Sequence, residues 1–259
     1  MAFDLESASS QDLTNLNGVG VIDADTLSIA ITFMVESRSG TDILYYSAQD
    51  LTSEANRGLT LNVVAPAAGD WDLFIVYNFS TSLGQWKHDT TLSFNTFYRI
   101  VVTYDRSSTT NDPILYIDGT KNTVGSGLLE DATPSGTATT GLDSIRVGSY
   151  ESGFLYADCR VAELAHWTRI LSDGEALAIS KGYSPAFFRP VTYWDFIRGL
   201  TDQIGGVVLT NNNSATVTPH PAVIYPTTPR PLVAPPVVAG VGIRNPFGGP
   251  MSLRNPLGA

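Results

Sequence analysis

The chain has 259 residues, a formal net charge of −10 and a single cysteine, Cys159. This length suffices for one large β-sandwich or two small domains without disulfide bonds. The acidic balance argues against nucleic acid as a partner, because contacts to phosphate need clustered Lys and Arg. Met1 is not followed by a basic and then apolar leader, so we expect synthesis in a reducing cytosol without membrane insertion. A protein that leaves the cell within a virus particle is compatible with this pattern.

A series of short apolar segments follows a polar N-terminus. We expect residues 1–20, which lack long apolar runs, to contribute one edge strand and turns. Residues 26–33 then place Leu27, Ile29, Ile31 and Phe33 on one face of an extended chain, the period of 2 that is typical of a strand. Similar runs occupy 43–46, 59–64, 73–77, 98–105, 114–117, 145–148 and 161–167. Their spacing, with Gly, Ser, Asn and Pro between them, predicts an all-β sandwich or barrel.

The segment 97–119 is predicted to form the middle of this sandwich. Both faces of 98–105 are largely apolar, so we expect this strand to be covered on both sides. Residues 114–117 form a second β-branched and aromatic run, which ends at Asp118-Gly119, a pair that favours a tight turn. The two runs are therefore predicted to be paired antiparallel strands.

One short helix is predicted after residue 171. Ser172 and Glu175 have the spacing of a capping box, in which each side chain bonds the backbone amide of the other residue. Asp173 suits the positive end of the helix dipole and Lys181 the negative end, and Gly182 supplies a left-handed stop. We expect further strands at 191–196, 207–210 and 215–217, beside the sandwich.

Residues 226–259 have a different composition. They contain eight of the 15 prolines, three arginines and no acid, which leaves 12 basic and 25 acidic side chains in 1–225. Such proline density favours extended polyproline-type chain. A generic tail of this kind is a disordered tether, but this one is apolar, and we hypothesise an arm that lies on a neighbouring subunit. The expected contacts belong to two echoing motifs: Arg244, Pro246 and Phe247, then Arg254, Pro256 and Leu257.

Two segments carry a family resemblance. The run Tyr98 to Asp105, followed by Leu115 to Gly119, resembles the "W-x-H-V-A-x-T-Y-D … Y-V-N-G" signature of the laminin-G-like, concanavalin A-like lectin and glucanase sandwiches. Residues 161–175 are similar to the closing strand and helix of that family, "G-x-I-D-E-V-x-I-Y-N-R-A-L-S-D-E-E". The matching residues there are Trp167, Arg169, Leu171, Ser172 and Glu175.

This resemblance covers roughly residues 20–182 and suggests a phage-encoded type. It implies a concanavalin A-like jelly-roll β-sandwich at 1–184 with one short helix, followed by additional strands at 185–225. The composition of 226–259, and not the resemblance, predicts the extended C-terminal arm there. Two departures are evident, since Cys159 replaces the usual Gly and Ala162 the usual Asp. The second removes a carboxylate and puts any transferred role for that acid in doubt.

No enzymatic activity is expected. Glycoside hydrolysis needs two carboxylates flanking the bond, and the Glu-x-Asp-x-x-Glu run of the glucanases is absent. Asp70-Trp71-Asp72 is the nearest imitation, but it is more simply a turn that enters the strand at Leu73. The chain has no Gly-x-Ser-x-Gly elbow, and its histidines, at 88, 166 and 220, stand in unrelated contexts.

Binding residues are sought among aromatics and loop acids. Sugar rings stack on exposed aromatic rings, and the candidates near loops are Trp71, Tyr77, Trp86 and Tyr150, of which we expect about half to be core residues, whereas Trp167 and Trp194 look structural. No cofactor is required by the sequence. Ca²⁺ is the one metal considered, with loop ligands Asp105, Asp112, Asp118 and Asp143, although aspartate is common in loops because it makes turns.

These observations favour a structural protein of a virion, a bacteriophage capsid decoration or fibre-type protein that displays a lectin-like domain. It would be made in the host cytoplasm and lie at the virion surface, with its arm held by a partner such as the major capsid protein. A homo-oligomer such as a trimer suits that role, and a surface glycan is the expected ligand. The alternatives are a free-standing carbohydrate-binding adhesin and a glycoside hydrolase with unconventional acids.

Overall fold

The computed structural model describes residues 1–15, 23–37, 40–48, 57–64, 70–142, 144–150 and 155–225. Residues Met1–Tyr225 form one compact unit. The predicted arm contacts and Asp143 therefore lie outside the described residues. No helix in the described ranges is long and apolar enough to cross a membrane.

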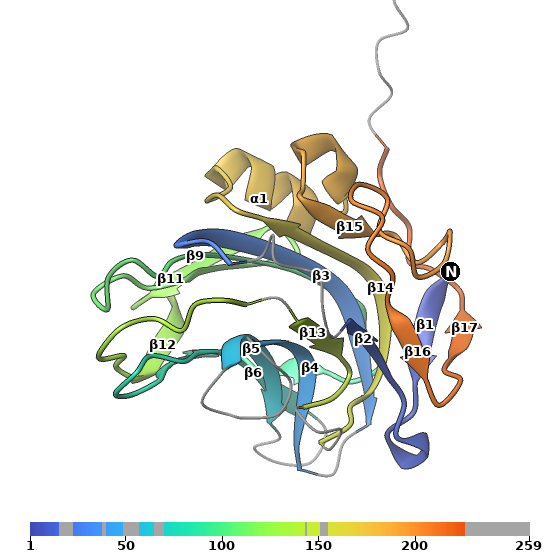
Figure 1. The fold of residues 1–259 in the computed structure, drawn as a ribbon, viewed down its shortest axis with the longest axis horizontal. Coiled ribbons are helices and arrows are strands. Elements are labelled where there is room, and N and C mark those ends of the chain that lie inside the picture. Colours follow the sequence, from blue (N-terminus) through green and yellow to red (C-terminus); the bar gives the residue numbers. More distant parts are fainter. Residues whose placement is uncertain are drawn as a thin grey trace, which may run out of the picture. The chain divides into compact units, whose positions relative to one another are not determined.

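The first sheet is antiparallel, and we call it the helix-side sheet (Figure 1). Its strand β14 pairs on one side with β3 and on the other with β1 and β15. The strands run in the order β17 (Thr216–Thr218), β1 (Ala2–Leu5), β14 (Asp158–Trp167), β3 (Thr26–Ser37), β9 (Tyr98–Asp105), β10 (Ile114–Ile117) and β11 (Thr120–Val124). The short β15 (Thr192–Trp194) lies on the same side of β14 as β1 and pairs with the end of β14.

The second sheet packs against the first and is called the helix-free sheet. Its strands run in the order β16 (Thr210–Asn212), β2 (Asp12–Asn15), β13 (Ser144–Val147), β4 (Thr41–Ala48), β5 (Arg57–Val64), β6 (Asp70–Tyr77), β7 (Gly84–His88) and β12 (Gly127–Ala132). The short β8 (Leu92–Ser93) pairs with the start of β6. A parallel pairing of β11 with β12 joins the sheets at one side.

The main core lies between the two sheets. Alternate residues of each strand point into it, because side chains in a strand alternate between its two faces. Ile29, Ile31 and Phe33 of β3 enter it from one sheet, and Trp71 and Trp86 enter it from the other. These contacts bury large apolar side chains, which is the dominant favourable contribution to folding.

A second, smaller core lies on the outer face of the helix-side sheet. Helix α1 (Asp173–Ser180) begins with both bonds of the predicted Ser172–Glu175 capping box. Its Ala176 and Ile179 pack on Val101 of β9, which explains why both faces of that strand are apolar. Two short 3₁₀ segments, η1 (Ser7–Ser9) and η5 (Pro185–Phe188), complete the described helices.

The predicted strands are confirmed, including the antiparallel pairing of β9 with β10, except at 207–210, where only Thr210 belongs to a strand. The tight turn after β10 is also confirmed, since Asp118 and Gly119 have φ values of 46° and 84°. The edge-strand prediction for residues 1–20 is wrong, because β1 lies between β14 and β17, and β2 lies between β13 and β16. β16 and β17, from residues 210–218, pair with the outer edges of β2 and β1. No local pattern in the sequence indicates this long-range pairing.

Candidate functional site

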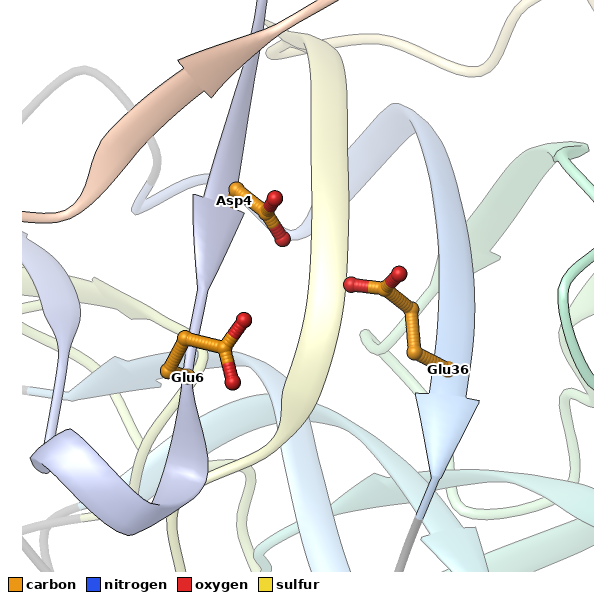
Figure 2. A group of neighbouring side chains, drawn as sticks. All are labelled: Asp4, Glu6 and Glu36. Carbon is orange, nitrogen blue, oxygen red and sulfur yellow. The ribbon is translucent and has the colours of Figure 1, made fainter.

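Three carboxylates meet on the outer face of the helix-side sheet, and we call them the acidic cluster. Asp4 lies in β1, Glu6 follows it, and Glu36 lies near the end of β3. Their neighbours in sequence, such as Phe3 and Val35, point into the core, so the pleat places the acids outside. The three side chains point toward one another, with oxygen atoms within 4.8 Å (Figure 2).

Arg160 of β14 lies between these acids. Its Nη2 atom is 2.7 Å from Oε1 of Glu36, and its Nε atom is 3.4 Å from Oδ1 of Asp4. One cation does not neutralise three carboxylates. Burial and the neighbouring Asp4 raise the pKa of Glu36 to about 7, despite the opposing effect of Arg160. The cluster is therefore arranged to hold a proton near neutral pH, and carboxylate oxygens are also ligands for Ca²⁺.

A cleft of about 440 Å³ lies at the same end of β3 as the acidic cluster. Its lining includes Ser7, which follows Glu6 directly, and Thr41 at the start of β4. Tyr156 adds a half-buried aromatic ring, and its neighbour Leu155 has a left-handed φ of 51°. An aromatic ring beside hydroxyl groups and carboxylates can take a polar ligand that has an apolar face.

The four predicted sugar-stacking aromatics lie elsewhere, and their exposure was predicted wrongly. Trp71, Tyr77 and Trp86 are 0 % exposed and Tyr150 is 3 % exposed. Trp71 packs on Phe33, and the Trp86 indole donates a hydrogen bond to Asp112. Trp71, Tyr77 and Trp86 fill the main core, as Trp194 does, because large aromatic rings supply much of a sandwich core. Trp167 lies in the smaller core beneath α1, and Tyr150 packs on Tyr46 in a separate cluster.

Two of the predicted calcium ligands, Asp105 and Asp118, are not brought together. Asp105 lies at one end of β9, where its carboxylate accepts a hydrogen bond from the Ser107 amide. Asp118 lies beside the other end, where it accepts from the Arg99 amide. Both carboxylates thus serve turns, and an ion cannot bridge the length of the strand.

The acidic cluster was missed because its members are far apart in the sequence. Asp4 and Glu6 have the i, i+2 spacing that places two acids on one face of a strand. That spacing was the only local signal, and only strand pairing brings Glu36 to them.

The sequence motifs that imitate catalytic sites have structural roles. Asp72 lies in β6, not in a turn, and forms an ion pair with Lys87 at 2.8 Å. His166 is buried between the Tyr45 hydroxyl at 2.8 Å and the Thr192 hydroxyl at 2.7 Å. Burial lowers the pKa of His166 to about 3, so its imidazole is neutral at physiological pH.

The two departures from the family pattern also have structural roles. Cys159 is completely buried in the core, and burial raises the pKa of its thiol. The carbonyl of Ala162 is 2.8 Å from Nε2 of His220 and accepts its hydrogen bond. Neither position holds a group that could act on a substrate.

Comparison with known proteins identifies the class of fold. No known family and no curated protein sequence matches this chain. A heptameric SAP-like pentraxin from Limulus polyphemus is similar in structure, with a TM-score of 0.57 and 10 % identity over 83 % of this chain and 93 % of the pentraxin. The chain is a concanavalin A-like jelly-roll β-sandwich.

A proposed carbohydrate-binding protein from Bacteroides ovatus is also similar. Its TM-score is 0.56 at 14 % identity, over 85 % of this chain. The match spans 60 % of that protein's own length. At such low identities the likeness concerns the fold.

Proposed function

We propose that this chain is a non-enzymatic carbohydrate-binding protein and that the cleft beside Tyr156 takes the sugar. The observation that carries the proposal is the combination, at one end of a lectin-like fold, of a 440 Å³ cleft, an aromatic ring and nearby acids. Its volume lies in the range of small-ligand sites, about 300–1,000 Å³. The ring can contact the C–H face of a pyranose while Thr41 and Ser7 bond its hydroxyl groups.

A hydrolase is less well supported. Asp4 and Glu36 share Arg160, and oxygen atoms of the three acids lie within 4.8 Å of one another, whereas glycosidases hold two carboxyl groups about 5–10 Å apart on either side of the bond. We therefore assign the cluster a binding role. No cofactor is obligatory in this proposal, and Ca²⁺ at the cluster would assist binding by neutralising its charge.

The experiment is a glycan array probed with the full chain, with and without EDTA. Tyr156→Ala is expected to abolish or strongly weaken the signal, because it removes the ring. Phe187→Ala is the matched control, since Phe187 is an exposed aromatic residue of η5, outside the cleft. Equal binding by the wild type and Tyr156→Ala, or no binding to any glycan, would contradict the proposal.

We further propose that the sandwich is displayed on a virion, as a decoration or fibre-type protein. The support is the contrast between an acidic body, 1–225, and an apolar proline-rich segment, 226–259, that carries three arginines and no acid. Residues 226–259 would attach the sandwich, 1–225, to another virion protein, such as the major capsid protein. The sandwich would form a homo-oligomer, such as a trimer.

Deletion of 226–259 separates this setting from the free-standing adhesin. Because Met1–Tyr225 is compact, we expect the chain that lacks 226–259 to fold. In the virion setting the truncated chain keeps its glycan binding and loses incorporation into particles. Full incorporation without the segment would reject the attachment role, and a soluble monomer with undiminished binding would favour the adhesin.

A further inference from the structure

A second cleft, of about 280 Å³, lies at the opposite end of β3 from the acidic cluster. Asp25, which directly precedes β3, and Arg106, which directly follows β9, contribute to its lining. Phe79 lies beside them, and Thr109 and Thr137 come from the loops on either side. We call this the Arg106 cleft.

The loop that carries Thr137 is fixed to the sandwich. The Thr137 amide donates to the Ser80 hydroxyl at 2.9 Å, and the Thr137 carbonyl accepts from the Ser80 amide at 2.8 Å. Two residues later, the carbonyl of Thr139 accepts from the Tyr77 hydroxyl at 2.8 Å. A wall held by such bonds is pre-organised, so a ligand would not have to order it.

Arg106 lines the bottom of the cleft, and its positive charge is balanced by the carboxylate of Asp23. Its side chain is 2 % exposed, and Nη2 lies 2.5 Å from Oδ1 of Asp23. The same guanidinium donates to the Tyr77 hydroxyl and the Thr139 carbonyl. Its Nε atom makes no hydrogen bond within the described ranges, and the nearest oxygen of Asp25 is 3.9 Å away.

The rim of the cleft offers unused hydrogen-bonding groups. The side-chain hydroxyls of Thr109, Thr137 and Thr140 form no hydrogen bond with any residue that the structure describes. The Asp25 side chain is 75 % exposed, so its carboxylate can accept from a ligand. Because Asp23 already neutralises Arg106, the negative charge of Asp25 is unbalanced and disfavours an anionic ligand.

We propose that the Arg106 cleft is a second binding site, which takes one ring of a neutral saccharide. The ligand needs several hydroxyl groups for the threonines and for Asp25, and an apolar face toward Phe79. It carries no negative charge, so sialic acid and sugar phosphates bind less well than uncharged pyranoses. The site does not depend on the cleft beside Tyr156, and the sandwich would thus bind saccharide at both ends.

The test measures binding of the full chain to the methyl glycosides of glucose, galactose, mannose and N-acetylglucosamine by saturation-transfer NMR and titration. The double variant Thr137→Val with Thr140→Val keeps side-chain shape and removes two hydroxyls. It is expected to weaken binding about tenfold, as the loss of one or two modest hydrogen bonds predicts. Thr120→Val, at an exposed position of β11, is the matched control and leaves affinity unchanged.

The outcomes distinguish this site from the first. The Arg106 cleft is supported if the threonine double variant binds the glycosides more weakly and Tyr156→Ala still binds them. This holds whether or not the cleft beside Tyr156 also binds. Binding that Tyr156→Ala removes and the double variant leaves intact overturns it, as does the absence of binding to all four glycosides. Tighter binding of sialic acid than of any neutral glycoside also overturns it.

Discussion

The two ends of β3 differ in how they balance charge. At the acidic cluster one arginine, with 31 % of its side chain exposed, lies among three carboxylates from two segments. At the Arg106 cleft one buried arginine is paired with Asp23 at 2.5 Å and bonded to two further oxygens. The first end can respond to protons and cations, whereas at the second end an ion pair and two hydrogen bonds hold the loops in place. We call the end of β3 at the acidic cluster the adjustable end, because its charge can change with pH, and the end at the Arg106 cleft the rigid end.

The largest expected effect comes from breaking the rigid end. Arg106→Met would remove the cationic partner of the Asp23 carboxylate and the hydrogen bond to the Thr139 carbonyl that helps to hold the 133–141 loop. Removing one partner of a buried pair costs about 3–5 kcal/mol, and we expect the free energy of unfolding to fall by that amount. Urea denaturation measures it. Arg160→Met at the acidic end is the control and should cost less, because that arginine is more exposed; equal losses would remove the distinction.

The next effect is a pH dependence at the adjustable end. The folded state raises the pKa of Glu36 from 4.5 to about 7, so it binds this proton more tightly than the unfolded chain does. The resulting stabilisation is complete below pH 4.5 and is lost as the pH rises through 7. Its size is on the order of 1–2 kcal/mol once solvent screening is allowed for.

Thermal melts of Glu36→Gln across this pH range measure that effect. The variant keeps a hydrogen-bonding side chain but cannot ionise, so its melting temperature should fall less with rising pH than that of the wild type. Glu6→Gln, the exposed member of the cluster, should retain the wild-type slope. A slope that is unchanged in Glu36→Gln would show that another group titrates.

The smallest effect sharpens the role of Asp25. Because its side chain is 75 % exposed and lies 3.9 Å from Arg106, Asp25→Asn should change the free energy of unfolding by no more than about 0.5 kcal/mol. Urea denaturation would check this. A loss comparable to that of Arg106→Met would mean that Asp25, and not Asp23, balances the buried arginine, and the carboxylate would then be unavailable to a ligand.

Local patterns predicted the elements that depend on neighbours in sequence. Alternation of apolar residues placed Ile29, Ile31 and Phe33 on the inner face of β3, and Asp118-Gly119 placed the turn after β10. Polar strands were missed, as in β11 and β12, because their residues lie at the side of the sandwich where burial imposes little pattern. The series of strands was sufficient for the fold class.

The sequence by itself determined a sandwich with a capped helix, since strand period, turn residues and the Ser172–Glu175 box act over a few residues. Only the tertiary structure decided which groups are accessible and which are paired. It buried Trp71 and Trp86, and it brought Glu36 to Asp4 and Asp23 to Arg106. The reason is that burial and electrostatic pairing depend on distances between strands, and strand pairing joins residues that no local spacing relates.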